Sequence, residues 1–77
     1  MNDQKAEVTQ RGIFSMQVCV PKTWSDEQAT NFANAQNPAG TECGWIMRKE
    51  GDPALAGDPE RRACAERAGF VHIMFDA

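Results

Sequence analysis

Apolar and polar residues alternate regularly in the segment from Ile13 to Val20. One face of this segment is apolar and carries Phe14, Met16, Val18 and Val20. The opposite face carries Ser15, Gln17 and Cys19. A period of two is typical of a half-buried strand, and the following Pro21 cannot donate a hydrogen bond to a neighbouring strand. The pattern therefore predicts a strand that ends at Pro21.

A helix is predicted to begin after Ser25. Ser25 and Gln28 have the spacing of a capping box, in which each side chain bonds the backbone of the other residue. The first turn is acidic, with Asp26 and Glu27, and Trp24 can pack back onto the helix. The apolar stripe at helical spacing consists of Ala29, Phe32 and Ala33. The run 37–40, Asn-Pro-Ala-Gly, ends the helix.

A second strand is predicted over residues 44–50, and two similar turns follow it. The triplet Gly-Asp-Pro occurs at 51–53 and again at 57–59. Each Asp can cap a turn whose first helical residue is the Pro. The first copy leads only to Ala54-Leu55-Ala56, which predicts a single turn. The second leads to a short helix over 60–68, ended by Gly69 as a left-handed residue.

The final strand, residues 70–75, is apolar on both faces. Val71, Ile73 and Phe75 lie on one face, and Phe70, His72 and Met74 on the other. A strand of this kind needs cover on both sides, but the second helix offers only Ala63, Cys64 and Ala68. We therefore expect Phe70, His72 and Met74 to form an interface, most simply that of a homodimer. The alternative is that residues 51–68 cover this face in a monomer, as a helix or as a loop.

Together these elements predict an α+β fold, a small three-stranded sheet in β-α-β-(α)-β order. The main helix is expected to pack on the face that carries Phe14, Met16, Val18, Val20 and Ile73. Residues 1–11 are polar and without periodicity, so we expect a flexible N-terminal tail followed by a single domain over 12–77.

Composition narrows the function classes. The net charge of −3 does not favour binding of nucleic acid, which needs a basic face. Residues 1–7 lack the apolar core of a signal peptide, and no apolar run is long enough to cross a membrane. We therefore expect a cytoplasmic protein whose Cys19, Cys43 and Cys64 are thiols.

Two constellations involve these cysteines. Cys19, Cys43, Cys64 and His72 have the composition of a structural zinc site, but no pair has the short spacing typical of one. Cys64 or Cys43 could also be a nucleophile activated by His72. The alternative to both is that Cys19 and Cys64 are small buried side chains and His72 is a packed histidine. We expect no metal, no other cofactor and no catalytic residue.

Basic and aromatic residues could form an anion site. Trp45, Arg48 and Arg61 are the first candidates, because guanidinium groups bind phosphate oxygens in pairs and indole stacks on bases. Lys22, Lys49, Arg62, Arg67 and Trp24 could add to it. The alternative is that the arginines pair with nearby acidic residues, including Asp52, Asp58, Glu60 and Glu66, on a solvated face.

The segment from Val20 to Ala77 resembles small uncharacterised proteins encoded by tailed bacteriophages and prophages. The resemblance rests on the runs 21–28 (Pro-Lys-Thr-Trp-Ser-Asp-Glu-Gln), 37–41 (Asn-Pro-Ala-Gly-Thr), 44–45 (Gly-Trp) and 71–73 (Val-His-Ile). It implies a phage accessory protein that acts in the bacterial host cytosol, and it assigns no functional residue.

The function expected from this is non-enzymatic. The chain is expected to bind and inhibit a host or immune protein. The alternative is that it sequesters an anionic, nucleotide-like signalling molecule.

Overall fold

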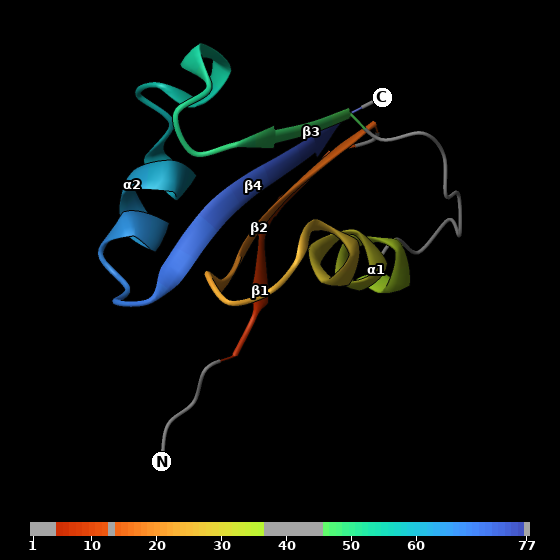
Figure 1. Ribbon diagram of the computed structural model, residues 1–77. Coiled ribbons are helices and arrows are strands. Elements are labelled where there is room, and N and C mark those ends of the chain that lie inside the picture. Colours follow the sequence, from red (N-terminus) through yellow and green to blue (C-terminus); the bar gives the residue numbers. More distant parts are fainter. Residues whose placement is uncertain (1–4, 13, 37–45, 77) are drawn as a thin grey trace.

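The computed structural model describes residues 5–12, 14–36 and 46–76. These residues form a small α+β fold with a four-stranded sheet, two helices and one 3₁₀ turn (Figure 1). The elements are β1 (Glu7–Arg11), β2 (Ser15–Pro21), α1 (Asp26–Gln36), β3 (Ile46–Lys49), η1 (Pro53–Leu55), α2 (Pro59–Ala65) and β4 (Phe70–Asp76).

The sheet is antiparallel throughout, in the order β1-β2-β4-β3. Its centre is the pair β2 and β4, which are matched over seven residues from Ser15↔Asp76 to Pro21↔Phe70. β1 pairs with the outer edge of β2, and β3 with the outer edge of β4. The two strands with the strongest apolar pattern in the sequence therefore lie in the middle of the sheet.

The prediction of a three-stranded sheet with a flexible tail through residue 11 is wrong at residues 7–11. These residues form β1, which pairs antiparallel with β2 and has an irregularity between Val8 and Gln10. Their sequence, Glu-Val-Thr-Gln-Arg, is mostly polar because an edge strand exposes most of its surface. Only Val8 packs against the core.

The main helix is confirmed, as is the face on which it packs. The Ser25 amide donates to Gln28 Oε1 at 2.8 Å, and the Gln28 amide donates to Ser25 Oγ at 3.1 Å, which is the predicted capping box. The core on this face consists of Met16, Val18, Val20, Ala29, Ala33, Ile73 and Phe75. The prediction for Phe14 is wrong: its side chain is 72% exposed, because it precedes β2 at the turn from β1.

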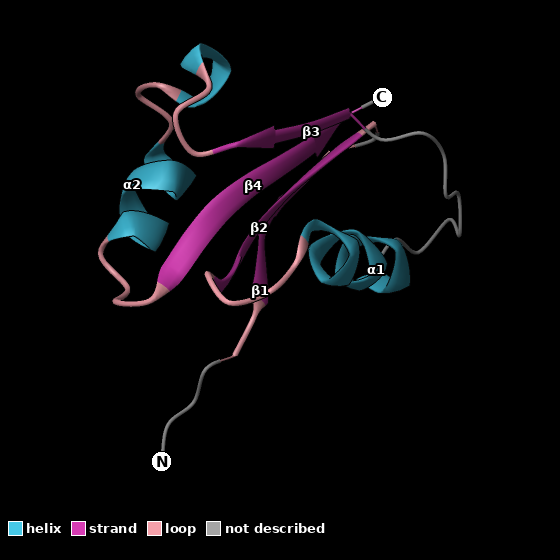
Figure 2. Ribbon diagram, viewed as in Figure 1, coloured by secondary structure: helices cyan, strands magenta, loops and turns pink. Residues whose placement is uncertain are grey.

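The opposite face of the sheet is covered by α2 and the turn before it (Figure 2). Leu55 of η1 and Cys64 of α2 are buried. Beneath them Phe70 is 7% exposed and His72 is fully buried, while Met74 is half-buried. The prediction of an uncovered face at Phe70 and His72 is therefore wrong, and the alternative in which residues 51–68 cover it is the one observed.

Both Gly-Asp-Pro turns have the predicted caps. The Asp52 side chain accepts a hydrogen bond from the Ala54 amide, and the Asp58 side chain accepts one from the Glu60 amide, both at 2.9 Å. Gly69 has φ of +83°, the left-handed conformation expected after α2. Among the described residues, no helix has the length and apolar character needed to span a membrane.

Candidate binding groove

Two of the three residues predicted to bind an anion, Arg48 and Arg61, are described by the structure, and both pair with carboxylates. Trp45 lies outside the described residues. Arg48 pairs with Asp52 at 3.6 Å and with Asp76 at 3.4 Å, and Arg61 pairs with Glu50 at 2.8 Å. A hollow of about 270 Å³ beside Arg61 is lined by both Glu50 and Asp52, so carboxylates already occupy the surroundings of this guanidinium. Pairing with acidic residues, the predicted alternative, is what these two arginines do.

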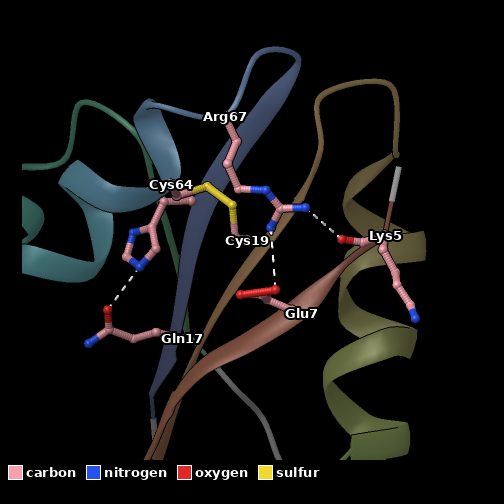
Figure 3. Close-up of a disulfide and its surroundings, with 7 residues drawn as sticks. Lys5, Glu7, Gln17, Cys19, Cys64 and Arg67 are labelled. Atoms are coloured by element: carbon pink, nitrogen blue, oxygen red, sulfur yellow. Dashed lines mark hydrogen bonds and ion pairs between the residues drawn. A yellow bond between two sulfur atoms is a disulfide. The ribbon is translucent and has the colours of Figure 1, made fainter. Parts of the chain in front are cut away.

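Cys19 and Cys64 are not thiols as predicted, because they form a disulfide that joins β2 to α2 (Figure 3). Both residues are buried. The bond occupies two of the four ligands of the hypothetical zinc site and the Cys64 nucleophile of the hypothetical Cys–His pair. Cys43 lies outside the described residues. No cluster of three or more metal-binding side chains occurs within the described part of the chain.

Arg67 holds the end of α2 beside this disulfide (Figure 3). Its guanidinium donates a hydrogen bond to the Lys5 carbonyl at 3.0 Å and lies 3.6 Å from the Glu7 carboxylate. The guanidinium carbon also lies 3.8 Å from the centre of the Phe70 ring. Arg67 thus connects α2 to β1 and to the start of β4.

His72 belongs to a buried chain of hydrogen bonds. The Gln17 amide nitrogen donates to Gln10 Oε1 at 2.9 Å, so Gln17 Oε1 faces His72 Nε2 at 2.8 Å. An amide oxygen only accepts, and His72 Nε2 must therefore carry a proton. Nδ1 is buried and has no hydrogen-bond partner within residues 5–12, 14–36 and 46–76. The ring is a packed histidine, one of the predicted alternatives.

The pKa of His72 is lowered from its ordinary value of 6.5, mainly because burial disfavours the charged ring. The nearby carboxylates of Asp58 and Glu50 oppose this shift, and the charge of Arg61 adds to it. Burial acts to raise the pKa of Asp58. Hydrogen bonds with Glu60 and Gln17 and the charge of a protonated His72 act in the opposite direction and are stronger together, so the pKa of Asp58 is lowered. Burial thus favours the neutral form of the imidazole.

An opening in the sheet lies at the start of β4. β3 pairs with β4 only from Ile46↔Asp76 to Lys49↔Ile73, and the chain then turns away at Glu50 and Gly51. Figure 1 shows β3 beside one end of β4 only. Within the described residues, Phe70–His72 therefore have a strand neighbour, β2, on one side alone. We call these three residues the open edge.

Two hollows flank the open edge. The larger has a volume of about 410 Å³ and lies on the face that carries α1, with an apolar lining of Val20, Trp24, Val71 and Ile73. The smaller has a volume of about 170 Å³ and is lined by Ala65 and Phe70. Lys22, Glu50 and Val71 line both. We call the open edge together with the two hollows the β4 groove.

One positive charge at the β4 groove has no counter-charge among the residues that the structure describes. Lys49 pairs with Asp26 at 2.9 Å, and Glu50 pairs with Arg61 at 2.8 Å, so these four charges neutralise each other. The exposed Lys22 side chain makes no ion pair or hydrogen bond with any residue that the structure describes; only its backbone amide bonds, to the Gly69 carbonyl. The groove therefore combines an apolar floor with one cation that has no partner in the described part of the chain.

Sequence reasoning placed Lys22 in an anion pocket and Trp24 as a helix staple, and it did not identify the groove. The sequence offers no signal for it, because the strands predicted over 44–50 and 70–75 are of similar length. In the structure, the register between β3 and β4 ends at Lys49↔Ile73, whereas β4 begins at Phe70. Unequal neighbouring strands leave part of the longer one without a partner.

Comparison of the chain with protein-family models, with curated proteins and with solved structures yields no match.

Proposed function

We propose that the chain is a non-enzymatic accessory protein of the phage type, which binds and inhibits a protein of the bacterial host or of its immune defence. The observation that carries this proposal is the β4 groove, in which an apolar floor of Val20, Val71 and Ile73 meets Lys22, a cation without a partner among the described residues. Concave apolar surfaces with a few polar groups are typical binding sites. The groove is the surface through which the partner is proposed to bind.

Sequestration of an anionic nucleotide is the weaker alternative. Arg48 and Arg61, its first candidates, are each bound to carboxylates within the chain. An anion would have to displace Asp52, Asp76 or Glu50, all of which carry the same sign of charge as the ligand. Catalysis has less support still, because Cys64 is in a disulfide and the His72 ring is buried against Gln17.

The proposed place of action is the bacterial cytosol, and the disulfide weighs against it. Cytosolic thiols are kept reduced, whereas disulfides persist in oxidising compartments. Alkylation of free thiols in cell extract, followed by mass spectrometry, distinguishes the two. Alkylation of both Cys19 and Cys64 shows that they are free thiols and supports a cytosolic location. An intact disulfide between them places the protein in an oxidising compartment instead.

The homodimer is still a prediction, but its expected surface is no longer available. Phe70 and His72 are buried within one chain, and Met74 is half-buried. A dimer would have to form through another surface. Light scattering at micromolar concentration gives the mass directly: a mass of two chains supports the dimer, and a mass of one chain excludes it under those conditions.

Affinity capture from bacterial cells tests the proposed function. The wild type is compared with Lys22→Glu, which reverses the charge at that position of the groove, and with Lys5→Glu, the same change beside β1 on the opposite edge of the sheet. We expect a host protein that the wild type and Lys5→Glu retain and that Lys22→Glu loses. That protein, once purified, should also be inhibited by the wild type in its own assay.

Two different results would contradict the proposed function. A partner that all three variants retain equally would place the binding surface outside the groove. Capture of no protein, together with binding of a nucleotide in calorimetry, would replace the proposed function by its alternative.

A further inference from the structure

The backbone of the open edge has a defined orientation. The Lys22 amide donates to the Gly69 carbonyl at 2.8 Å, which makes this pair a hydrogen-bonded position in the ladder between β2 and β4. Hydrogen-bonded positions recur at every second residue, so Val71 also faces β2 with its backbone groups. The backbone groups of Phe70 and His72 consequently point away from β2, toward the side of β4 on which β3 lies further along the strand.

The carbonyl oxygens of Phe70 and His72 therefore point toward this edge of the sheet. The Phe70 amide is already used, because it donates to the Arg67 carbonyl at 3.2 Å. The register that ends at Lys49↔Ile73 places Glu50 opposite the His72 carbonyl. The chain then turns, with the Asp52 amide bonded to the Lys49 carbonyl, so no residue of β3 or of this turn lies opposite Phe70. The Phe70 carbonyl can therefore accept a hydrogen bond from an amide of an extended chain at this edge.

The two hollows match the side chains of such a chain. Successive side chains of a strand point to opposite faces of the sheet, and the hollows lie on the two sides of the same edge, joined at Val71. The larger hollow, beside Trp24, has room for a branched aliphatic or aromatic side chain. The smaller hollow takes the neighbouring side chain of the same incoming chain, which points to the opposite face of the sheet.

We propose that the β4 groove binds an extended peptide segment, which adds to β4 at Phe70–His72 as an additional strand. The partner segment places one large apolar side chain in the hollow beside Trp24 and one acidic side chain next to Lys22. This inference rests on the proposed function, since it specifies the kind of partner segment that the groove takes. Strand addition obtains affinity from backbone hydrogen bonds and specificity from alternate side-chain pockets.

An acidic side chain follows from the charges of the groove. Lys22 is the cation without a partner among the described residues, while Lys49 is neutralised by Asp26. A carboxylate on the incoming segment would complete this pairing. A basic segment would instead place like charges together at Lys22, which disfavours its binding.

A nuclear magnetic resonance titration tests the proposal with a defined probe, the blocked peptide acetyl-Thr-Thr-Glu-Leu-Thr-Val-Thr-amide. We expect the largest shift changes at the amides of Phe70–His72, Lys22 and Glu50. Replacing Glu in the peptide by Lys should weaken binding to the wild type and strengthen binding to Lys22→Glu. The Lys5→Glu protein should behave as the wild type does. Shift changes confined to another surface, or none at millimolar peptide, would overturn the proposal.

Methylation of the peptide backbone separates strand addition from simple occupation of the hollows. Only peptide amides of one parity face β4 and can donate to the Phe70 carbonyl. Methylating amides of one parity should weaken binding about tenfold, the equivalent of one lost hydrogen bond, while methylation of the other parity has little effect. Equal effects at both parities would exclude strand pairing.

Failure of this inference can be told apart from failure of the proposed function. If a bacterial partner is captured but neither it nor the peptides depend on Lys22 or on backbone amides, the protein binds its partner elsewhere. If the peptides bind with the expected pattern but no partner is inhibited, the groove is a peptide site and the inhibitory role is wrong.

Discussion

The side chain of His72 lies in the sheet face beneath α2 and has no exposed surface. Sequence reasoning allowed a packed histidine at this position but favoured an interface, because the apolar content of residues 51–68 seemed too small to cover the strand. Two features supply the missing cover. Leu55 is fully buried, and Cys64 is bonded to Cys19. Neither a buried leucine in a single turn nor a pairing of cysteines 45 positions apart has a local signal in the sequence.

The burial of His72 predicts a pH-dependent stability. Since its folded pKa lies below the ordinary value of 6.5, the unfolded chain binds more protons in the interval between the two values. The free energy of unfolding is therefore highest above pH 6.5 and falls as the pH decreases from there toward the folded pKa. His72 is the only histidine in the chain, so urea unfolding at about pH 7.5 and about pH 5.5 isolates its effect.

The variant His72→Gln is the control, because it retains a polar group but does not titrate. Its stability should change less than that of the wild type between the two pH values. An equal loss of stability in both proteins would assign the pH dependence to other groups. The lowered pKa of Asp58 contributes separately, since its stabilisation is present above the ordinary carboxyl value of 3.8 and is lost as the pH falls below it.

At the scale of elements, the sequence predicted those whose signals are local. The capping box at Ser25, the two Asp caps and the left-handed Gly69 were all predicted and are confirmed. β1 was not predicted, because an edge strand need not be apolar. The open edge of β4 was not predicted either. It depends on which strands are neighbours, and sequence separation does not reveal that.

Phe32 of α1 packs at the edge of the apolar core. Its ring is half-buried and meets the Trp24 ring edge-on, with 5.7 Å between the centroids and 69° between the planes. The sequence, which treats Phe32 as a core anchor, predicts a cost of about 3 kcal/mol or more for Phe32→Ala. Half-burial lowers this expectation to about 2 kcal/mol. Urea unfolding measures it, with the exposed Asn31→Ala on the same helix as the control.

The control should lie within about 0.5 kcal/mol of the wild type. A Phe32→Ala protein as stable as the control would mean that α1 does not depend on the contact between the two aromatic rings.

Leu55 anchors η1 although this turn has only three residues. Its side chain is fully buried. We expect Leu55→Ala to cost about 3 kcal/mol, the usual effect of a cavity in a core. The neighbouring Ala54 is exposed, and Ala54→Ser should change the stability by less than about 0.5 kcal/mol. Equal thermal midpoints for the two variants would contradict the burial of Leu55.

At the scale of the whole molecule, the two faces of the sheet are stabilised in different ways. The face under α1 is a continuous apolar core. The face under α2 combines the disulfide, the Arg67 contacts and the hydrogen-bonded pair of Gln17 and His72. A chain of 77 residues is expected to have a total stability of only roughly 4–12 kcal/mol. A single cross-link can therefore supply a large share of it.

We expect loss of the disulfide to be the most destabilising single change on the α2 face. Cys19 and Cys64 are 45 positions apart, and closure of a loop of that length corresponds to about 4 kcal/mol in the chain-entropy model. Urea unfolding with and without reductant measures the difference, and Cys64→Ser should reproduce the reduced protein. Cys43→Ser, which leaves both bonded cysteines in place, is the matched control and should keep the wild-type stability in oxidising buffer.

Because α2 has one buried residue, Cys64, hydrogen exchange should accelerate in α2 more than in α1 on reduction. Unchanged exchange in α2 would mean that Arg67 and Leu55 hold this face closed without the bond.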